Sequence, residues 1–456
     1  MLTDEKTFVE RLRSLARVQN ADVVREELSG VPVPDLAEGI ERLDTEDAIA
    51  LLYQLDEETA ADVLVELPTE ITKRLVSELP DTTLAHYLDI LPMDDALELG
   101  EVLPEDRFEA LLQVIPKEDA LELRRALTYP DGSAGRLMTE DFFEVTPETS
   151  MRQIIRMIRE ASDEEYETVN DIYVLDEHKH LLGVFSLRQA VRAPVLSIAK
   201  EVMVEDVITC TPETPAETVA RQIAKYGFYA MPVLDERGRM VGIFTVDDAQ
   251  EVLEESATED LLKLGGVSGD AESYLSLGVV QLVRRRLPWL LVLFVAEFFT
   301  GSVLRHYTGQ SADGGKTILA NLMLFIPLLI GAGGNSGSQV TTTITRALAI
   351  GEVHPRDGFA VMRRELGVAS LIGGTLGLCG FLRAMLWGTD WHISAVVGLA
   401  LPAIVIWATI LGSLLPLGAK RFGVDPAVMS APFITTFVDA TGLIIFFEIA
   451  RRFVQF

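Results

Sequence analysis

The sequence predicts a multidomain protein with three parts: an all-α helical-repeat domain, an α/β domain built from two similar units, and a five-span α-helical membrane domain. A 12-residue repeat, a longer duplicated segment and a series of apolar stretches predict these parts in that order. Charge divides the chain in the same way, because residues 1–280 contain 60 acidic and 25 basic side chains, whereas residues 281–456 contain 9 and 14. An acidic soluble half therefore precedes an apolar half, and the net charge of −30 argues against a nucleic-acid partner.

Residues 1–130 are expected to form the helical-repeat domain. Pairs of an apolar residue and a proline recur every 12 residues, and Leu43-Asp44 and Leu55-Asp56 continue the register upstream. The pairs are Leu67-Pro68, Leu79-Pro80, Leu91-Pro92, Leu103-Pro104 and Ile115-Pro116. Proline and the acids that follow it suit the first turn of a helix, and helices this short must stack to bury their apolar faces. Any one of these acids is expected on a solvated surface rather than at a metal ion.

Residues 131–250 contain the longer repeat, with copies at about 131–195 and 196–250. The segment YVLDEHKHLLGVFSLRQA (173–190) returns as PVLDERGRMVGIFTVDDA (232–249). Each copy is expected to fold as a strand, a helix, two strands joined by a polar turn, and a helix. This pattern resembles a tandem pair of CBS modules, a regulatory fold that often senses adenine nucleotides or ions. A structural spacer is the alternative.

The CBS resemblance implies a nucleotide site in the second copy. In that family an Asp near the end of a Gly-hydrophobic-hydrophobic-Ser/Thr-x-x-Asp segment holds the nucleotide ribose. The segment GIFTVDD supplies Asp248, and Thr245 and Tyr173 are further candidate contacts. Because the first copy has Gln189 at the matching place, ATP is expected at one of the two sites at most.

Residues 251–282 are expected to connect this domain to the membrane. The stretch EVLEESATEDLLKLGG has apolar residues at helical spacing, and acids that include Glu259 and Asp260 lie between them. An acidic helix between a sensor and a membrane domain is where a coupling element belongs.

Residues 283–456 are expected to contain five membrane helices. Apolar stretches occur at about 287–304, 317–335, 367–388, 393–418 and 428–450, each close to the ~20 residues that cross a ~30 Å hydrocarbon core. Placing the N-terminus in the cytoplasm puts nine basic residues inside and five outside, which leaves the C-terminus external. The start, MLTDEKTFVERL, has no apolar signal core, so no cleaved targeting peptide is expected.

Asp439 lies at the centre of the last apolar stretch, PFITTFVDATGLIIFF. About 16 Å of helix separates it from either interface, and a charged aspartate in lipid costs at least about 2.5 to 3.5 kcal/mol. A water-filled pathway is therefore expected, with Thr435 and Ala431 one and two turns away on the same face, and a structural ion pair is the alternative. The segment GAGGNSGSQVTTTIT (331–345) fits exposed backbone groups at a cavity and close helix packing equally well. No role is assigned to Glu297, a second acid at mid-span.

The whole arrangement resembles the MgtE-type magnesium channels and transporters of bacteria. The resemblance rests on the module order, on GGNSGSQ and on the closing VDPAVMSAPFITTFVDATGL, and it covers nearly the whole chain. It implies a homodimer in the cytoplasmic (inner) membrane with one central pore, in which Asp439 binds a hydrated Mg²⁺. Thr435 and Ala431 would help to line the filter, with Asn335 nearby. Mg²⁺ gives up its waters reluctantly and is usually held by one or two carboxylates, which agrees with such a site.

The same resemblance implies that cytosolic Mg²⁺ closes the pore by bridging acids of the N-terminal, CBS and connecting segments. The implied regulatory ligands are Asp247, Asp270, Glu259, Asp260, Asp94 and Asp95. Transport of another divalent cation, such as Co²⁺ or Mn²⁺, and a non-transporting Mg²⁺ or nucleotide sensor are the alternatives. An enzyme is not expected, because the apolar half has no nucleophile with a base and the chain has no phosphate-binding loop. The expected partners are a second copy, Mg²⁺ and the lipid bilayer.

Overall fold

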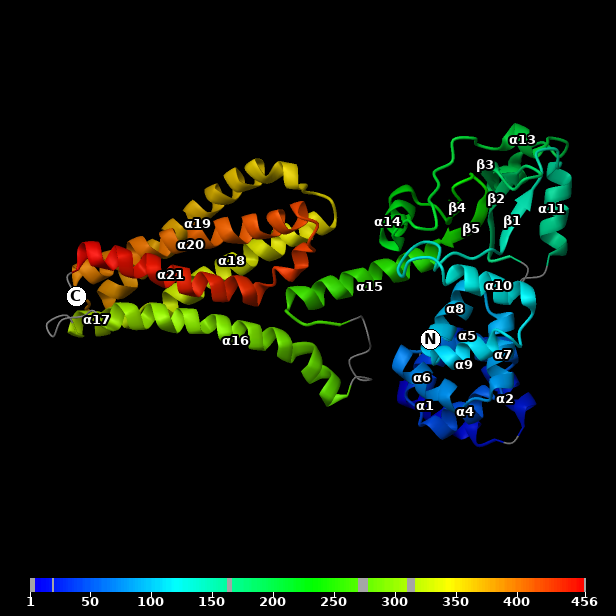
Figure 1. Cartoon of the computed structure of the whole chain (residues 1–456), viewed down its shortest axis with the longest axis horizontal. Helices are drawn as coiled ribbons and strands as arrows, with labels where there is room; N and C mark the ends of the chain where they lie inside the picture. The colour runs from blue at the N-terminus through cyan, green and yellow to red at the C-terminus, as the bar shows by residue number, and fades with distance from the viewer. Residues whose placement is uncertain (1–4, 19, 162–165, 270–277, 310–315, 455–456) are drawn as a thin grey trace. The chain divides into compact units, whose positions relative to one another are not determined.

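A computed structural model describes residues 5–18, 20–161, 166–269, 278–309 and 316–454 of the protein (Figure 1). The chain divides into two compact units, one ending at Ser256 and the other beginning at Ala257. The first contains the helical repeats and the α/β region, and the second contains the long apolar helices. The predicted fold class is confirmed.

The helical repeats share one local rule, which places a cap every 12 residues. The helices are α1 (Glu5–Ala16), α2 (Ala21–Leu28), α3 (Val33–Glu41), α4 (Thr45–Leu52), α5 (Glu57–Glu66), α6 (Thr69–Glu78), α7 (Asp81–Ile90), α8 (Met93–Val102), α9 (Glu105–Leu111) and α10 (Lys117–Ala126). The N-cap residues from α2 to α10 are Asn20, Pro32, Asp44, Asp56, Pro68, Pro80, Pro92, Pro104 and Pro116. The predicted register is confirmed and extends further upstream, with each repeat proline at the cap instead of inside the helix.

Two kinds of cap maintain this register. Asp44 and Asp56 each accept a backbone N–H three residues later, at 2.9 Å, which satisfies a donor that the helix leaves free. Proline instead holds the chain in an extended conformation before the helix begins. The residue before each cap from Asp44 to Pro116, as at Leu67 and Leu79, is buried. A buried apolar residue therefore immediately precedes the start of a helix in these repeats.

The first copy of the α/β repeat has the predicted order of elements. β1 (Phe142–Val145) pairs in parallel with β2 (Thr168–Leu175), which pairs in antiparallel fashion with β3 (Leu181–Ser186). Helix α11 (Met151–Glu160) joins the first two strands, and α12 (Leu187–Arg192) follows the third.

The second copy departs from the prediction at its first strand. It contains α13 (Ala199–Val202), α14 (Ala216–Tyr226) and the antiparallel strands β4 (Ala230–Leu234) and β5 (Met240–Thr245), and α15 (Val246–Leu264) follows. The expected first strand is reduced to one parallel bridge between Cys210 and Val233. The next bond of that ladder would need an N–H on Pro232, which proline lacks.

Helix α15 also forms the helical part of the predicted connecting segment. It starts directly after β5 and ends at Leu264, where Gly265 and Gly266 follow. Gly266 adopts a positive φ of 71°, a left-handed conformation that glycine adopts readily.

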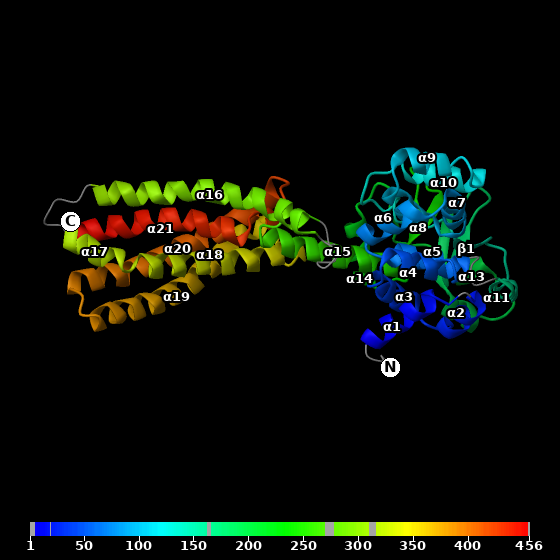
Figure 2. The same ribbon diagram turned by 90° about the horizontal axis from the view of Figure 1, so that it is seen from below.

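The membrane unit contains α16 (Val279–Gly309), α17 (Lys316–Met323), α18 (Ile326–Ala349), α19 (Gly358–Leu386), α20 (Trp391–Arg421) and α21 (Ala431–Phe453). Short 3₁₀ turns, η1 (Pro355–Asp357) and η2 (Pro426–Val428), precede α19 and α21. Five segments are long and apolar enough to cross a membrane, as predicted: Val279–Gly309, Ile318–Ala349, Pro355–Leu386, Trp391–Arg421 and Ala431–Phe453. Within this unit, α16 and α21 lie side by side in both views (Figures 1 and 2).

The glycine-rich segment 331–345 is continuous helix within α18. A Cβ on Gly333 would lie 2.6 Å from the Cγ2 atom of Ile404 in α20, and one on Gly337 would lie 2.8 Å from the Cγ2 atom of Ile434 in α21. Both distances are shorter than van der Waals contact, so only glycine lets these helices approach so closely. Of the two interpretations left open by the sequence, close helix packing is the one that the structure supports.

Candidate functional site

An acidic cavity of about 310 Å³ lies between α8 and the first half of α15. Asp94, Glu98 and Glu101 line it from α8, and Asp248, Glu251 and Glu255 line it from α15. Arg136 is the one basic side chain among its described lining residues, and it binds Glu101 and Asp131. The Oδ1 atom of Asp94 is buried and has no hydrogen-bond partner in the described part of the chain. Carboxylates therefore outnumber cations around this cavity.

The pKa values around this cavity reflect the crowding. Burial, followed by the charges of Asp248, Glu167 and other acids, raises the pKa of Asp95 to about 7. Burial and the charge of Glu251 raise the pKa of Glu98 to about 8. Burial and the charge of Asp248 also raise the pKa of Asp94 well above its ordinary value. Ionising these groups together is unfavourable unless a cation is present.

A second acidic cavity, of about 500 Å³, lies beside the first within the same unit. It is lined by eight carboxylates, with no Lys, Arg or His among its described lining residues: Glu58, Asp62, Asp89, Asp119, Glu122, Glu140, Asp141 and Glu167. Burial, followed by the charge of Glu122, raises the pKa of Glu140 to about 7 despite the nearby Arg125. Both cavities are thus suited to cations and unsuited to anions.

Neither cavity is a preformed metal centre. No three His, Cys, Asp or Glu side chains within the described ranges are arranged to hold a metal ion directly. An ion that keeps its water shell, as Mg²⁺ commonly does, needs carboxylates at a greater distance than direct ligation requires.

The structure brings together some of the predicted regulatory acids. Asp94 lines the first cavity, and both Asp95 and Asp247 interact electrostatically with Asp248. Glu259 and Asp260 belong to the second unit, where both have interaction partners. Asp270 lies outside the described residues.

The sequence analysis did not single out Glu98 and Glu251, two of the carboxylates that line the first cavity. Glu98 stands four residues after Asp94 on α8, and Glu251 three residues after Asp248 on α15, spacings that put each pair on one helix face. The spacing is visible in the sequence, but the sequence does not show that these two helix faces line one cavity.

The predicted nucleotide contacts belong to three elements: Tyr173 to β2, Thr245 to β5 and Asp248 to α15. The Thr245 hydroxyl donates a hydrogen bond to Asp248, at the start of α15. Tyr173 lies in an apolar cluster with Leu175 and Ile243, and its hydroxyl is buried without a partner in the described residues. Gln189 caps α12, where its side-chain oxygen accepts the Ser186 N–H at 2.8 Å.

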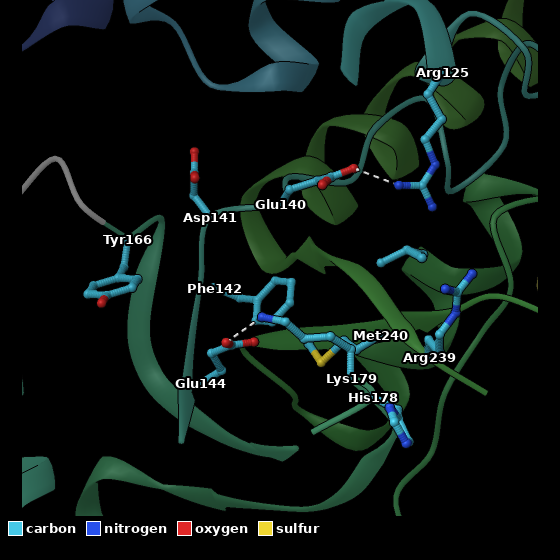
Figure 3. A pocket seen from close by; sticks show the side chains of 11 residues that line it. Arg125, Glu140, Asp141, Phe142, Glu144, Tyr166, His178, Lys179, Arg239 and Met240 are labelled. Atoms are coloured by element: carbon cyan, nitrogen blue, oxygen red, sulfur yellow. Dashed lines mark hydrogen bonds and ion pairs between the residues drawn. The ribbon is translucent and has the colours of Figure 1, made fainter. Parts of the chain in front are cut away.

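A third cavity, of about 510 Å³, lies near the turns of the two strand pairs (Figure 3). The three Arg and Lys side chains that line it are already paired, since Arg125 binds Glu140 at 3.4 Å, Lys179 binds Glu144 and Arg239 binds Asp235 at 2.6 Å. Its charges therefore balance within the cavity, unlike those of the two acidic cavities.

In the membrane unit, polar groups of α18 and α21 contact one another in the two turns of α21 that precede Asp439. The Ala431 carbonyl accepts hydrogen bonds from the hydroxyls of Thr435, at 3.0 Å, and Ser338, at 3.4 Å, and the two hydroxyls lie 3.1 Å apart. Asn335 is exposed one turn before Ser338. Asp439 is half-buried, and its Oδ1 atom is buried with no hydrogen-bond partner among the described residues. Ser338 is an addition to the predicted set.

The end of α15 is bound to the segment that begins α21. Lys263 contacts Asp425 at 2.9 Å and Glu259 at 2.7 Å. Burial disfavours the charged form of Lys263, but the hydrogen bonds that Lys263 donates to Glu259 and Asp425 outweigh this effect and raise its pKa to about 12. Asp425 also caps η2 by accepting the Ala427 N–H at 2.9 Å. The connecting helix therefore contacts the segment that positions the helix of Asp439.

Comparisons with known proteins agree with this architecture. Family profiles match residues 326–449 as "Divalent cation transporter", residues 31–132 as "MgtE intracellular N domain", and residues 134–195 and 199–255 as "CBS domain". The magnesium transporter MgtE of Thermus thermophilus is 38% identical over 72% of this chain and 71% of the relative. The magnesium transporter MgtE of Enterococcus faecalis is 32% identical over 73% and 72%.

A solved structure described as the soluble part of a magnesium transporter matches 55% of this chain and 98% of that chain, with a TM-score of 0.51 and 25% identity. The five apolar helices and the transporter profile indicate an integral membrane protein that is not an enzyme. The resemblance seen in the sequence is confirmed: the chain belongs to the MgtE family of divalent cation transporters.

Proposed function

We propose that this protein is a homodimeric Mg²⁺ channel that admits Mg²⁺ to the cytoplasm and closes when cytosolic Mg²⁺ binds to its acidic surfaces. The observation that carries the transport part is Asp439, a carboxylate at mid-membrane with a buried oxygen that has no partner in the described chain. Relatives that are named magnesium transporters support Mg²⁺ as the cargo.

Asp439 is proposed to hold hydrated Mg²⁺ through its water shell. One carboxylate per chain suits this ion if a second copy supplies another, so that two aspartates face each other across a symmetry axis. Thr435, Ala431 and Asn335 would then contact the ion's waters, and Ser338 would fix the Ala431 carbonyl. Asn335 is exposed and free to face such a pathway.

The membrane potential would drive entry. With the N-terminus in the cytoplasm and the C-terminus outside, an inside-negative potential of 100 mV contributes about 2.3 kcal/mol per charge, or about 4.6 kcal/mol for Mg²⁺. The nine-to-five distribution of basic residues supports this orientation in the cytoplasmic membrane.

Regulation would use the acidic cavities. Asp94, Asp95 and Asp247 are proposed to share hydrated Mg²⁺ in the first unit, and Glu259 and Asp260 to bind it near the end of α15. Asp270 is proposed as a further regulatory ligand on the strength of the sequence alone. Without Mg²⁺, Asp94 and Asp95 repel neighbouring carboxylates or take up protons, as their raised pKa values indicate. Mg²⁺ would replace the protons and hold the facing helices together.

ATP is the proposed ligand that fits least well. Asp248, which accepts the Thr245 hydroxyl, faces a cavity lined mainly by acids, and an acidic surface repels a triphosphate. The Tyr173 side chain lies in an apolar cluster. ATP binding that persists in the Asp248→Asn variant would exclude Asp248 from the nucleotide site.

Mg²⁺ flux into vesicles tests the proposal. Asp439→Asn should abolish uptake by the reconstituted full-length protein, and uptake at the wild-type rate would contradict the pore assignment. Competition with Co²⁺ and Mn²⁺ in the same assay decides between Mg²⁺ and another divalent cargo. A protein that binds Mg²⁺ but transports no ion would be a sensor.

A further inference from the structure

Helices α16 and α21 run parallel and are joined near both ends of α21. At one end the Trp289 indole N–H donates to the Ser430 hydroxyl at 3.1 Å. At the other end the Tyr307 hydroxyl donates to Glu448 at 2.7 Å. The ring of Tyr307 also stacks on that of Phe447, with centroids 4.7 Å apart. These contacts set the register of the two helices.

This register places Glu297 of α16 at the depth of Asp439. Glu297 lies eight residues after Trp289, and Asp439 lies nine residues after Ser430, which gives rises of about 12 and 13.5 Å. From the other contact, Glu297 is ten residues from Tyr307 and Asp439 is nine from Glu448, or about 15 and 13.5 Å. The two carboxylates are also close enough to interact electrostatically.

The surroundings of Glu297 do not explain a structural role. Its side chain is exposed on α16, and no described residue forms a hydrogen bond or ion pair with it. An ionised carboxylate facing hydrocarbon at this depth is unfavourable, so acids within membrane helices generally face water or a partner. The cation that Asp439 is proposed to bind would supply a counter-charge to both carboxylates.

We propose that Glu297 is a second carboxylate of the cation pathway, which raises the affinity for hydrated divalent cations beside Asp439. The inference rests on the proposed role of Asp439 in transport. Glu297 acts through the water shell and the local potential, so its loss weakens cation capture without removing the Asp439 site. Each chain then contributes two carboxylates at one depth.

Flux kinetics of the full-length protein test this role. Initial Mg²⁺ uptake into vesicles is measured against external Mg²⁺ for the wild type, Glu297→Gln, Glu297→Asp and Asp439→Asn. The matched control is Glu365→Gln, an equal loss of charge on α19, which packs along α20. We expect a three- to tenfold rise in half-saturating Mg²⁺ for Glu297→Gln and less than twofold change for Glu297→Asp and the control.

The outcomes separate the two proposals. If Asp439→Asn abolishes uptake and Glu297→Gln stays within twofold of wild type, Glu297 is not part of the pathway. If Asp439→Asn transports normally, the pore assignment itself fails. A rise in half-saturating Mg²⁺ that Glu365→Gln reproduces would indicate a general effect of charge and would also overturn the role of Glu297.

A thiol at position 297 gives a second, independent test. In a background with Cys210→Ala and Cys379→Ala, Glu297→Cys is treated with water-soluble thiosulfonates of either charge. We expect the negatively charged adduct to lower half-saturating Mg²⁺ toward the wild-type value and the positively charged adduct to raise it. Absence of reaction with both reagents in vesicles would place the side chain in lipid and overturn the proposal.

Discussion

Replacing Asp95 with Asn should stabilise the packing of α8 beside α15 in Mg²⁺-free buffer, although it removes a charge. Burial and neighbouring acids raise the pKa of Asp95 from 3.8 to about 7, a difference of about 3 units. At 1.36 kcal/mol per unit, ionised Asp95 opposes folding by up to about 4 kcal/mol above pH 7.5. Water around the partly exposed side chain and coupling to other acids reduce this, so we expect a gain of about 2 kcal/mol.

The sign of the pH dependence follows from the same shift. The folded state of Asp95 binds a proton more tightly than the unfolded state, so the free energy of unfolding falls as pH rises from about 4 to about 7. Glu98, with a pKa raised to about 8, extends this fall toward pH 8. The wild-type contact should therefore be most stable at acidic pH when Mg²⁺ is absent.

Hydrogen exchange in the full-length protein measures both effects. A gain of 2 kcal/mol should slow exchange of the α8 and α15 amides about 30-fold at pH 7.5, after correction for intrinsic rates. Asp106→Asn is the matched control, because Asp106 is exposed and lies 12 residues after Asp94 in the repeat. Exchange that is unchanged or faster in Asp95→Asn, or wild-type protection that increases from pH 5.5 to 8, would refute the reasoning.

Two further predictions concern the membrane unit. Lys263→Gln removes the ion pair with Asp425, and because this partly exposed pair is worth about 1 kcal/mol at most, the Mg²⁺ concentration that half-inhibits flux should shift by up to about fivefold. The charge swap Lys263→Asp with Asp425→Lys should restore part of the shift. Gly337→Ala should destabilise the packing of α18 and α21 by about 1 to 3 kcal/mol, because its Cβ would lie 2.8 Å from Ile434. Thermal unfolding in detergent checks this, with Gly331→Ala, which has open space, as the control.

Much of the fold could be predicted because its signals are local. A cap every 12 residues is a property of a few neighbouring positions, and five apolar stretches of membrane length are visible without knowing which helices touch. The absence of the first strand in the second copy could not be predicted from local signals, because it depends on the pairing partner. Pro232 interrupts a ladder with a segment some 20 residues away. The glycines of α18 likewise show their role only beside Ile404 and Ile434.

The candidate site was less predictable, since it depends on which faces meet. Asp439 could be singled out from one chain segment, because an acid in the middle of a membrane helix is unusual by itself. Glu98 and Glu251 are unremarkable in an acidic helix, and they gain their importance from helices about 150 residues apart in sequence. Glu297 had no role until the contacts of Trp289 and Tyr307 gave the register of α16 against α21.

The raised pKa values connect Mg²⁺ sensing to pH. At pH 6 the carboxyls of Asp95 and Glu98 are largely protonated in the folded protein, and Mg²⁺ must displace these protons to bind. For each proton that Mg²⁺ displaces, the apparent affinity for Mg²⁺ rises by up to tenfold per pH unit, until the pH exceeds the pKa of that carboxyl. The Mg²⁺ concentration that half-inhibits flux should therefore fall steeply between pH 6 and 7 and become nearly constant above pH 8. Asp95→Asn should reduce the slope, and half-inhibition that does not vary with pH would show that these acids do not bind the regulatory ion.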